Sequence, residues 1–180
     1  MRSYVKENVG LSLEKHTEAS RVIKAFVIFF ALIALVLIAD QLTKEMARQS
    51  LALTGHLEVF IPGILNLIYV ENTGAAFGIL EGARWYFVIM AAVVTMASVL
   101  YLAFDKFSNF VEVFALSLIV SGAIGNVIDR IFHGYVTDFF SFAFINFPVF
   151  NVADIAITIG AVLFVAAVLL SPSHKKAELG

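Results

Sequence analysis

Long apolar runs, separated by short polar stretches, dominate the pattern of the chain. Four of these runs reach the roughly 20 residues that a helix needs to cross the hydrocarbon core of a bilayer. They predict membrane-spanning helices at about residues 22–46, 85–104, 110–132 and 151–170. Hydrophobic residues make up 61% of the chain and charged residues 14%, whereas a soluble domain is about half apolar and a quarter charged. We therefore expect residues 1–180 to form a single integral membrane domain of the all-α class.

The first apolar run could be interpreted as part of a cleaved signal peptide. Residues 1–21 are polar, and Lys24 precedes the apolar stretch 25–39. That stretch continues into the amphipathic sequence 40–48 without a small-residue cleavage site, and further apolar runs follow it. We therefore expect a retained first span, with residues 1–21 and the short polar tail 171–180 on the same side of the membrane.

Lysine and arginine residues divide the predicted topology into two sides. One set flanks the first span, the turn between the second and third spans, and the tail: Arg2, Lys6, Lys15, Arg21, Lys24, Lys106, Lys175 and Lys176. The other set is smaller: Lys44, Arg48, Arg84 and Arg130. Because cytoplasmic loops carry the excess of Lys and Arg, the larger set predicts that both termini are cytoplasmic. Asp40, Asp129, Asp138 and Asp154 then all fall toward the outer side.

The connection between the first two predicted spans has a β pattern. Residues 56–61 and 64–70 are short runs rich in β-branched and apolar residues, and they flank the turn dipeptide Pro62-Gly63. An open sheet edge cannot face lipid tails, because its backbone groups would be left unpaired. We therefore expect a hairpin or small sheet at or above the outer interface.

Residues 139–150 hold six phenylalanines in twelve positions. The run is too short to span the bilayer, so it predicts an interfacial segment between the third and fourth helices. Simple packing of these rings against the spans is the alternative interpretation. The connection between the second and third spans is different, a tight polar turn at residues 105–109.

Polar side chains interrupt the apolar helices near one predicted end. Residues three and four apart share a helix face, and three helices carry such a polar face: Asp40 with Lys44; Gly122, Gly125, Asn126, Asp129 and His133; and Asn151, Asp154 and Thr158. Ionisable groups in a membrane segment cost roughly 2.5–3.5 kcal/mol each, so they usually line a functional interior. Small residues on the same face let another helix approach closely.

The acids in this cluster indicate acid–base catalysis by a pair of carboxyl groups. Two neighbouring carboxyl groups share a proton, so one can activate water while the other polarises a carbonyl, as in aspartic proteases. Asp40 is better explained as an ion pair with Lys44, and Asp129 as a structural acid near a helix end. Periodicity alone does not choose among Asp129, Asp138 and Asp154.

Five short motifs, in this order along the chain, resemble those of bacterial lipoprotein signal peptidases (signal peptidase II). They are DQLTK at 40–44, NTGAAF at 72–77, GNVIDR at 125–130, VTDF at 136–139 and FNVAD at 150–154. The resemblance implies a four-span aspartyl endopeptidase of the bacterial inner membrane, with an extracytoplasmic β-cradle between helices 1 and 2. It also implies that Asp138 and Asp154 are the catalytic dyad.

The same resemblance implies further site residues and partners. The supporting, substrate-binding positions would be Asp40, Lys44, Asn72, Gly74, Asn126, Asp129, Arg130, Asn151 and Ala153. The substrate would be a prolipoprotein with a diacylglyceryl-modified cysteine, cleaved on the N-terminal side of that cysteine. We expect neither metal nor cofactor nor nucleic acid to take part, and we expect a monomer in contact with membrane lipid. The phenylalanine-rich segment and the hairpin would cover the site.

Two other classes of protein are alternatives to a peptidase. A small proton-coupled transporter predicts acids at the bilayer midplane and often an internal repeat, whereas here the acids gather toward one side and the sequence has no repeat. A non-enzymatic assembly subunit would bind a partner helix through its small-residue face and would tolerate Asp→Asn at Asp138 and Asp154.

Overall fold

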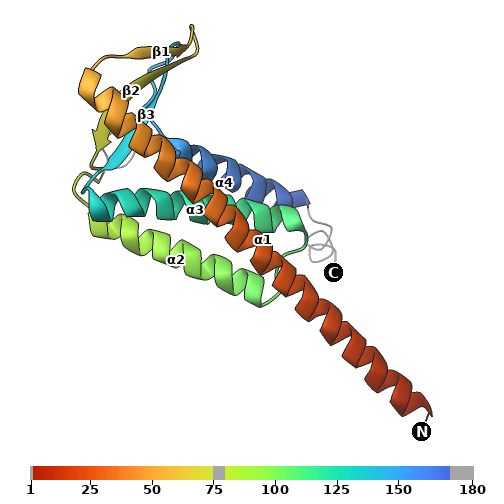
Figure 1. Ribbon diagram of the computed structural model, residues 1–180. Coiled ribbons are helices and arrows are strands. Elements are labelled where there is room, and N and C mark those ends of the chain that lie inside the picture. Colours follow the sequence, from red (N-terminus) through yellow and green to blue (C-terminus); the bar gives the residue numbers. More distant parts are fainter. Residues whose placement is uncertain (1, 75–79, 171–180) are drawn as a thin grey trace.

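Four apolar helices form the body of the molecule, and a small sheet extends from one end of it (Figure 1). This computed structural model describes residues 2–74 and 80–170. The elements along the chain are α1 (Arg2–Thr54), β1 (Glu58–Ile61), β2 (Leu65–Asn72), α2 (Arg84–Ala103), α3 (Phe110–Phe132), β3 (Val136–Phe142) and α4 (Val152–Leu170). Within the described residues, four helices are long and apolar enough to cross a membrane. The predicted architecture of four helices with a sheet between the first two is confirmed.

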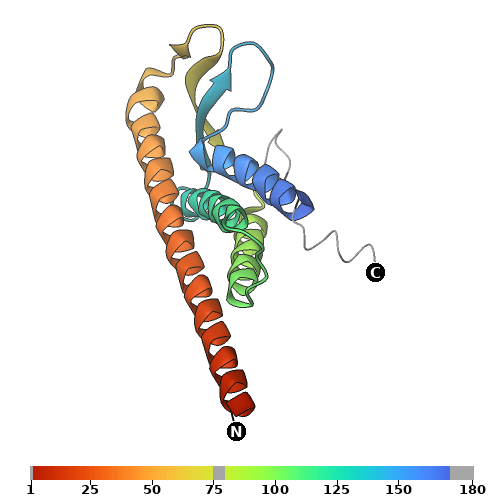
Figure 2. The same cartoon turned by 90° about the vertical axis from the view of Figure 1, so that its right-hand side faces the viewer.

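The predicted helix bounds hold for three of the four spans. α2 begins and ends one residue earlier than predicted, α4 begins one residue later, and α3 has the predicted bounds. α1 is much longer than expected, because it begins at Arg2 rather than near residue 22 and ends at Thr54 rather than near residue 46. No proline interrupts residues 2–54, so nothing in the backbone ends the helix where the apolar run ends. Its N-terminal part projects beyond the other helices (Figures 1 and 2).

α3 is the central helix and packs against α1, α2 and α4. Two glycines allow this close packing. A Cβ atom at Gly125 would lie 2.5 Å from the carboxylate of Asp40, and one at Gly122 would collide with the backbone carbonyl of Ala153. The small-residue face predicted for α3 is therefore its contact with α1 and α4, and it brings the polar residues of three helices together.

Asn109 begins α3 at the turn predicted between the second and third spans. Its side chain accepts hydrogen bonds from the backbone N–H groups of Val111 at 2.9 Å and Glu112 at 3.2 Å. These are two of the donors that the first turn of a helix leaves without a partner in the helix itself. The turn between α2 and α3 is thus closed by an N-cap, at the end of the bundle away from the sheet (Figure 1).

The predicted hairpin is present as β1 and β2, which pair antiparallel about a turn where Gly63 has a φ of 73°. β3 pairs antiparallel with the other edge of β2, giving the strand order β1-β2-β3. The prediction of a purely interfacial segment at 139–150 missed this strand. Its first residues complete β3, and Phe150 then bridges back to Phe140. β3 forms by pairing with β2, with Asn72 opposite Val136. The sequence of residues 139–150 alone does not reveal this strand, because its partner lies far back in the chain.

Candidate active site

Asp138 lies in the middle of β3 and is buried. Its carboxyl group accepts two amide hydrogen bonds, one from Nδ2 of Asn72 at 2.8 Å and one from Nδ2 of Asn151 at 2.6 Å. Asn72 is the last residue of β2, and Asn151 directly precedes α4. Strand pairing and a helix start therefore hold this acid from both sides.

Asp154 lies in the first turn of α4 and is half-buried. It accepts hydrogen bonds from Nδ2 of Asn126 at 2.8 Å and from the backbone N–H of Asn151 at 3.2 Å. In return, Oδ1 of Asn151 accepts the backbone N–H of Asp154 at 3.0 Å. This reciprocal pair is a capping box, and the helix N-terminus favours negative charge at Asp154.

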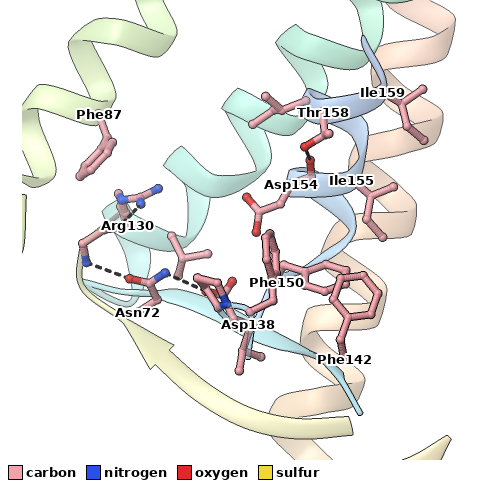
Figure 3. A pocket seen from close by; sticks show the side chains of 16 residues that line it. Asn72, Phe87, Arg130, Asp138, Phe142, Phe150, Asp154, Ile155, Thr158 and Ile159 are labelled. Atoms are coloured by element: carbon pink, nitrogen blue, oxygen red, sulfur yellow. Dashed lines mark hydrogen bonds between the residues drawn. The ribbon is translucent and has the colours of Figure 1, made fainter. Parts of the chain in front are cut away.

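The two carboxyl groups face one cavity. Figure 3 shows Asp138, on β3, and Asp154, on α4, directed into the same space. The cavity has a volume of about 510 Å³. Its polar lining comes from Asn72, Gly74, Arg130, Thr158 and the two acids. Most of its wall is apolar: Phe87, Val136, Phe142, Phe147, Pro148, Val149, Phe150, Ile155, Ile157 and Ile159.

This environment changes the proton affinity of Asp138. Burial, and next the nearby charge of Asp154, raise the pKa of Asp138 to about 7. The hydrogen bonds from Asn72 and Asn151 and the charge of Lys44 act in the opposite direction and offset part of the rise. Near neutral pH the cavity therefore contains a carboxyl group that both holds and releases a proton.

A buried ionic cluster of Lys44, Asp40 and Asp129 lies next to the two cavity acids. Nζ of Lys44 lies 3.0 Å from Oδ2 of Asp40 and 3.5 Å from Oδ2 of Asp129, and all three side chains are fully buried. Lys44 also donates a 2.9 Å hydrogen bond to Oδ1 of Asn126. The interpretation of Asp40 and Lys44 as an ion pair is confirmed, and Lys44 also links two acids from different helices through its charge.

Asp40 and Asp129 tie the ionic cluster to the backbone that carries the cavity acids. Asp40 accepts the backbone N–H of Ala153 at 2.9 Å, next to Asp154. Asp129 accepts the backbone N–H of Thr137 at 2.8 Å, next to Asp138. Both acids that the sequence analysis described as structural thus fix the position of the residue before a cavity acid.

Arg130 forms a separate wall of the cavity. Its Nη2 donates to the backbone carbonyl of Gly74 at 2.8 Å, and its Nη1 donates to that of Asn126 at 3.3 Å. The guanidinium carbon lies 4.1 Å from the centre of the Phe87 ring. Gly74 in turn donates its N–H to Oδ1 of Asn72 at 3.0 Å. Arg130 therefore holds the chain that follows β2 against the site, and Figure 3 includes these side chains.

The structure brings all of the predicted site residues into one connected region, and it adds two that the sequence analysis did not assign to the site. Nη1 of Arg48 donates to Oγ1 of Thr137 at 2.7 Å and lies 3.5 Å from Asp129. The spacing of Arg48 four residues after Lys44 was the available signal. Among residues 16–53, 55–74 and 80–170, whose side chains the structure describes, no group of three or more His, Asp or Glu side chains is placed to hold a metal ion.

Comparison with known proteins agrees with this geometry. The family model described as signal peptidase (SPase) II matches residues 32–170. That range includes every predicted site residue from Asp40 to Asp154. The chain belongs to the signal peptidase II family. The resemblance first drawn from five motifs is thereby confirmed, and a peptidase is favoured over the transporter and assembly-subunit hypotheses.

Two relatives and one solved structure show how far the similarity extends. The lipoprotein signal peptidases of Streptococcus pyogenes serotype M5 (strain Manfredo) and serotype M18 (strain MGAS8232) are both 43% identical over 137 residues, which is 76% of this chain and 90% of theirs. A bacterial membrane enzyme solved by the in meso method at 2.3 Å resolution has a TM-score of 0.74 and 36% identity, covering 82% of this chain and 91% of its own. The chain is accordingly a multi-pass membrane peptidase of the aspartic type.

Proposed function

We propose that Asp138 and Asp154 are the catalytic pair of this peptidase and that its substrates are prolipoproteins. The observation that carries the proposal is that both carboxyl groups line one cavity and that Asn151 contacts both of them. Its side chain donates to the carboxyl group of Asp138, and its backbone N–H donates to that of Asp154. Among the described residues, no other acid lines the cavity. Asp40 and Asp129 are engaged with Lys44 and with backbone N–H groups outside the cavity, which supports a positioning role for them.

The two acids differ in a way that supports distinct roles. Asp154 is placed to be the ionised member, because the N-terminus of α4 stabilises its negative charge. Asp138 is placed to hold the shared proton, because burial raises its pKa to about 7. Asp154 then acts as the base toward water, and Asp138 donates a hydrogen bond to the scissile carbonyl oxygen.

The reaction follows from these roles without a cofactor. Water attacks the scissile carbonyl carbon as Asp154 takes one of its protons, and Asp138 gives its proton to the carbonyl oxygen. The resulting tetrahedral diol breaks its C–N bond while the leaving nitrogen takes the proton from Asp154. Asp138 recovers its proton from the collapsing diol, so the pair returns to its starting state. The products are a carboxylic acid and a free amine.

The shape of the cavity supports a lipid-modified substrate. Its wall is mostly apolar, and Ile155 and Ile159 on α4 are exposed toward the region that the bilayer would occupy. A diacylglyceryl group on a cysteine would remain among lipid tails there and would hold the peptide bond before that cysteine at the acids. Phe142, Phe147 and Phe150 would cover the opposite side of the bound peptide. The relatives named lipoprotein signal peptidases support the same substrate class.

The placement in the membrane is part of the proposal. Arg21 contacts the turn between α2 and α3, which carries Lys106, and Lys24 lines a cavity with Phe110 at the start of α3. This turn lies at the end of the bundle away from the sheet (Figure 1), which supports a cytoplasmic location for that end and an outer location for the sheet and the catalytic cavity. All catalytic groups come from one chain, so a monomer would suffice. Both termini would then be cytoplasmic, in the inner membrane of a bacterium.

A comparison of two substrates tests this function. The purified chain would be given one prolipoprotein with and without diacylglyceryl on its cysteine, and the products would be identified by mass spectrometry. We expect cleavage of the modified form alone, with a product that begins at the lipidated cysteine. Equal cleavage of both forms would contradict the lipid requirement, while cleavage at other bonds would contradict the proposed placement of the substrate.

A further inference from the structure

A second cavity lies at the other end of the bundle from the two acids. It has a volume of about 410 Å³ and is lined by His16, Thr17, Ser20, Arg21, Lys24 and Phe110. The five α1 residues lie on one side of the helix by their spacing, and Phe110 is the first residue of α3. In both views α1 passes beside the turn between α2 and α3 at this level (Figures 1 and 2). We refer to these six residues as the basic cavity.

Arg21 fixes one wall of the basic cavity. Its Nη2 donates to the backbone carbonyl of Phe107, and its guanidinium carbon lies 4.4 Å from the centre of the Phe107 ring. Its Nη1 lies 3.6 Å from Oδ1 of Asp105. These contacts hold α1 against the turn between α2 and α3, so the cavity has a fixed shape. They also mean that Asp105 balances part of the arginine charge.

Lys24 supplies positive charge that no acid with a described side chain balances. Among the residues whose side chains the structure describes, neither Lys24 nor His16 has an ion-pair partner. The nearest acid along α1, Glu18, falls outside the line of cavity residues by its spacing. Lys24 is exposed and directly precedes the apolar residues 25–39, which places it at the boundary between headgroups and hydrocarbon.

We propose that the basic cavity binds the headgroup of an anionic phospholipid. The phosphate would accept hydrogen bonds from Nζ of Lys24 and from the hydroxyl of Ser20, while the acyl chains follow the apolar surface of α1 beside Phe110. Basic pockets between spans are suited to such headgroups, because a phosphate is both anionic and rich in acceptors. The cavity residues of α1 precede residue 32, where the family match begins. The site is therefore separate from the peptidase machinery.

Lipid retention measures this binding directly. The full chain would be purified from mixed micelles with equal amounts of phosphatidylglycerol and phosphatidylcholine, and retained lipids would be counted by native mass spectrometry. We expect selective retention of phosphatidylglycerol. Lys24→Gln should lower that retention about five-fold, since one basic residue near a membrane surface contributes about 1 kcal/mol. Lys106→Gln is the matched control, because Lys106 is exposed at the same end and does not line the cavity.

Three outcomes would overturn the proposal. Equal retention of the two lipids would mean that the cavity has no preference for an anionic headgroup. Equal loss in Lys24→Gln and Lys106→Gln would assign the effect to overall surface charge. Displacement of phosphatidylglycerol by millimolar inorganic phosphate would make the site one for free phosphate. Peptidase activity in detergent should be unchanged in both variants, since neither residue contacts the catalytic cavity.

Discussion

The side-chain amide of Asn151 donates a 2.6 Å hydrogen bond to the carboxyl group of Asp138. The other end of the same side chain accepts the backbone N–H of Asp154 at 3.0 Å, so one residue positions both acids. Asn151 is fully buried and occupies the position before α4. Because Asn151 starts α4 and also bonds Asp138 on β3, it aligns the first turn of α4 with β3.

Asn151→Ala should reduce cleavage far more than it reduces stability. Loss of a helix N-cap costs about 1 kcal/mol, whereas misplacement of a catalytic group by about 1 Å costs about 100-fold in rate. We therefore expect kcat to fall about 100-fold with a modest decrease in thermal unfolding temperature. Asn109→Ala removes the cap of α3 at the other end of the bundle and is the matched control. Equal rates in the two variants would mean that Asn151 is only a cap.

Lys44→Met should destabilise the fold. The substitution removes the only cation within hydrogen-bond or ion-pair distance of Asp40 among the described residues, and it leaves the carboxylates of Asp40 and Asp129 buried together. Breaking a buried ionic cluster in this way costs about 3–5 kcal/mol. Thermal unfolding in detergent measures the effect.

Glu45→Gln is the control for the Lys44 variant. Glu45 lies one position further along α1 and pairs with Arg48 at the surface. Because exposed ion pairs contribute little, its unfolding temperature should match that of the native chain. A Lys44→Met protein as stable as Glu45→Gln would contradict the ionic cluster described here.

The rate of cleavage should fall as the pH rises through about 7. Asp138 must hold a proton to donate to the scissile carbonyl, and burial together with the charge of Asp154 raises its pKa to about 7. A pH profile of kcat/KM measures this limb. Because the pair titrates as a unit, the apparent pKa belongs to both groups. A rate that stays constant between pH 6 and about 9 would contradict the role of Asp138 as the acid.

The protonation of Asp138 also makes the stability of the folded protein depend on pH. The folded pKa of about 7 lies above the ordinary value of 3.8 for Asp138. Protonated Asp138 therefore makes its full contribution to the stability of the folded state at pH values below 3.8. This contribution is lost as the pH rises through the folded-state pKa of about 7. Asp154→Asn removes the negative charge that, together with burial, raises the pKa of Asp138. In this variant the infrared signal of the protonated Asp138 carboxyl group should therefore disappear at a lower pH than in the native chain.

Much of this architecture could be predicted from the sequence because it is local. Span positions follow from the length of apolar runs, the hairpin from Pro62-Gly63, and the polar faces from helical spacing. Those faces converge because Gly122 and Gly125 leave room for α1 and α4. The choice of Asp138 and Asp154 over Asp129 needed the family resemblance, since spacing treats all three acids alike.

The features that the sequence analysis missed depend on contacts between distant residues. β3 pairs with β2, whose partner residues lie more than 60 positions earlier, and its phenylalanines resemble an interfacial segment when read alone. The bond from Arg48 to Thr137 joins α1 to β3, so the spacing of Arg48 after Lys44 indicates the arginine but not its partner. The length of α1 was underestimated because its apolar run begins well after the helix begins and stops before the helix ends.

Cleavage of a diacylglyceryl-modified prolipoprotein by the purified chain tests the central claim most directly. The native chain would be compared with Asp138→Asn and Asp154→Asn, each with matched folding by circular dichroism and thermal unfolding. We predict cleavage by the native chain and its loss, by at least about 1,000-fold, in both variants, because either change removes one half of the acid–base pair. A variant that is folded and retains near-native rates would contradict the assignment of the dyad and would make Asp129 the next acid to substitute.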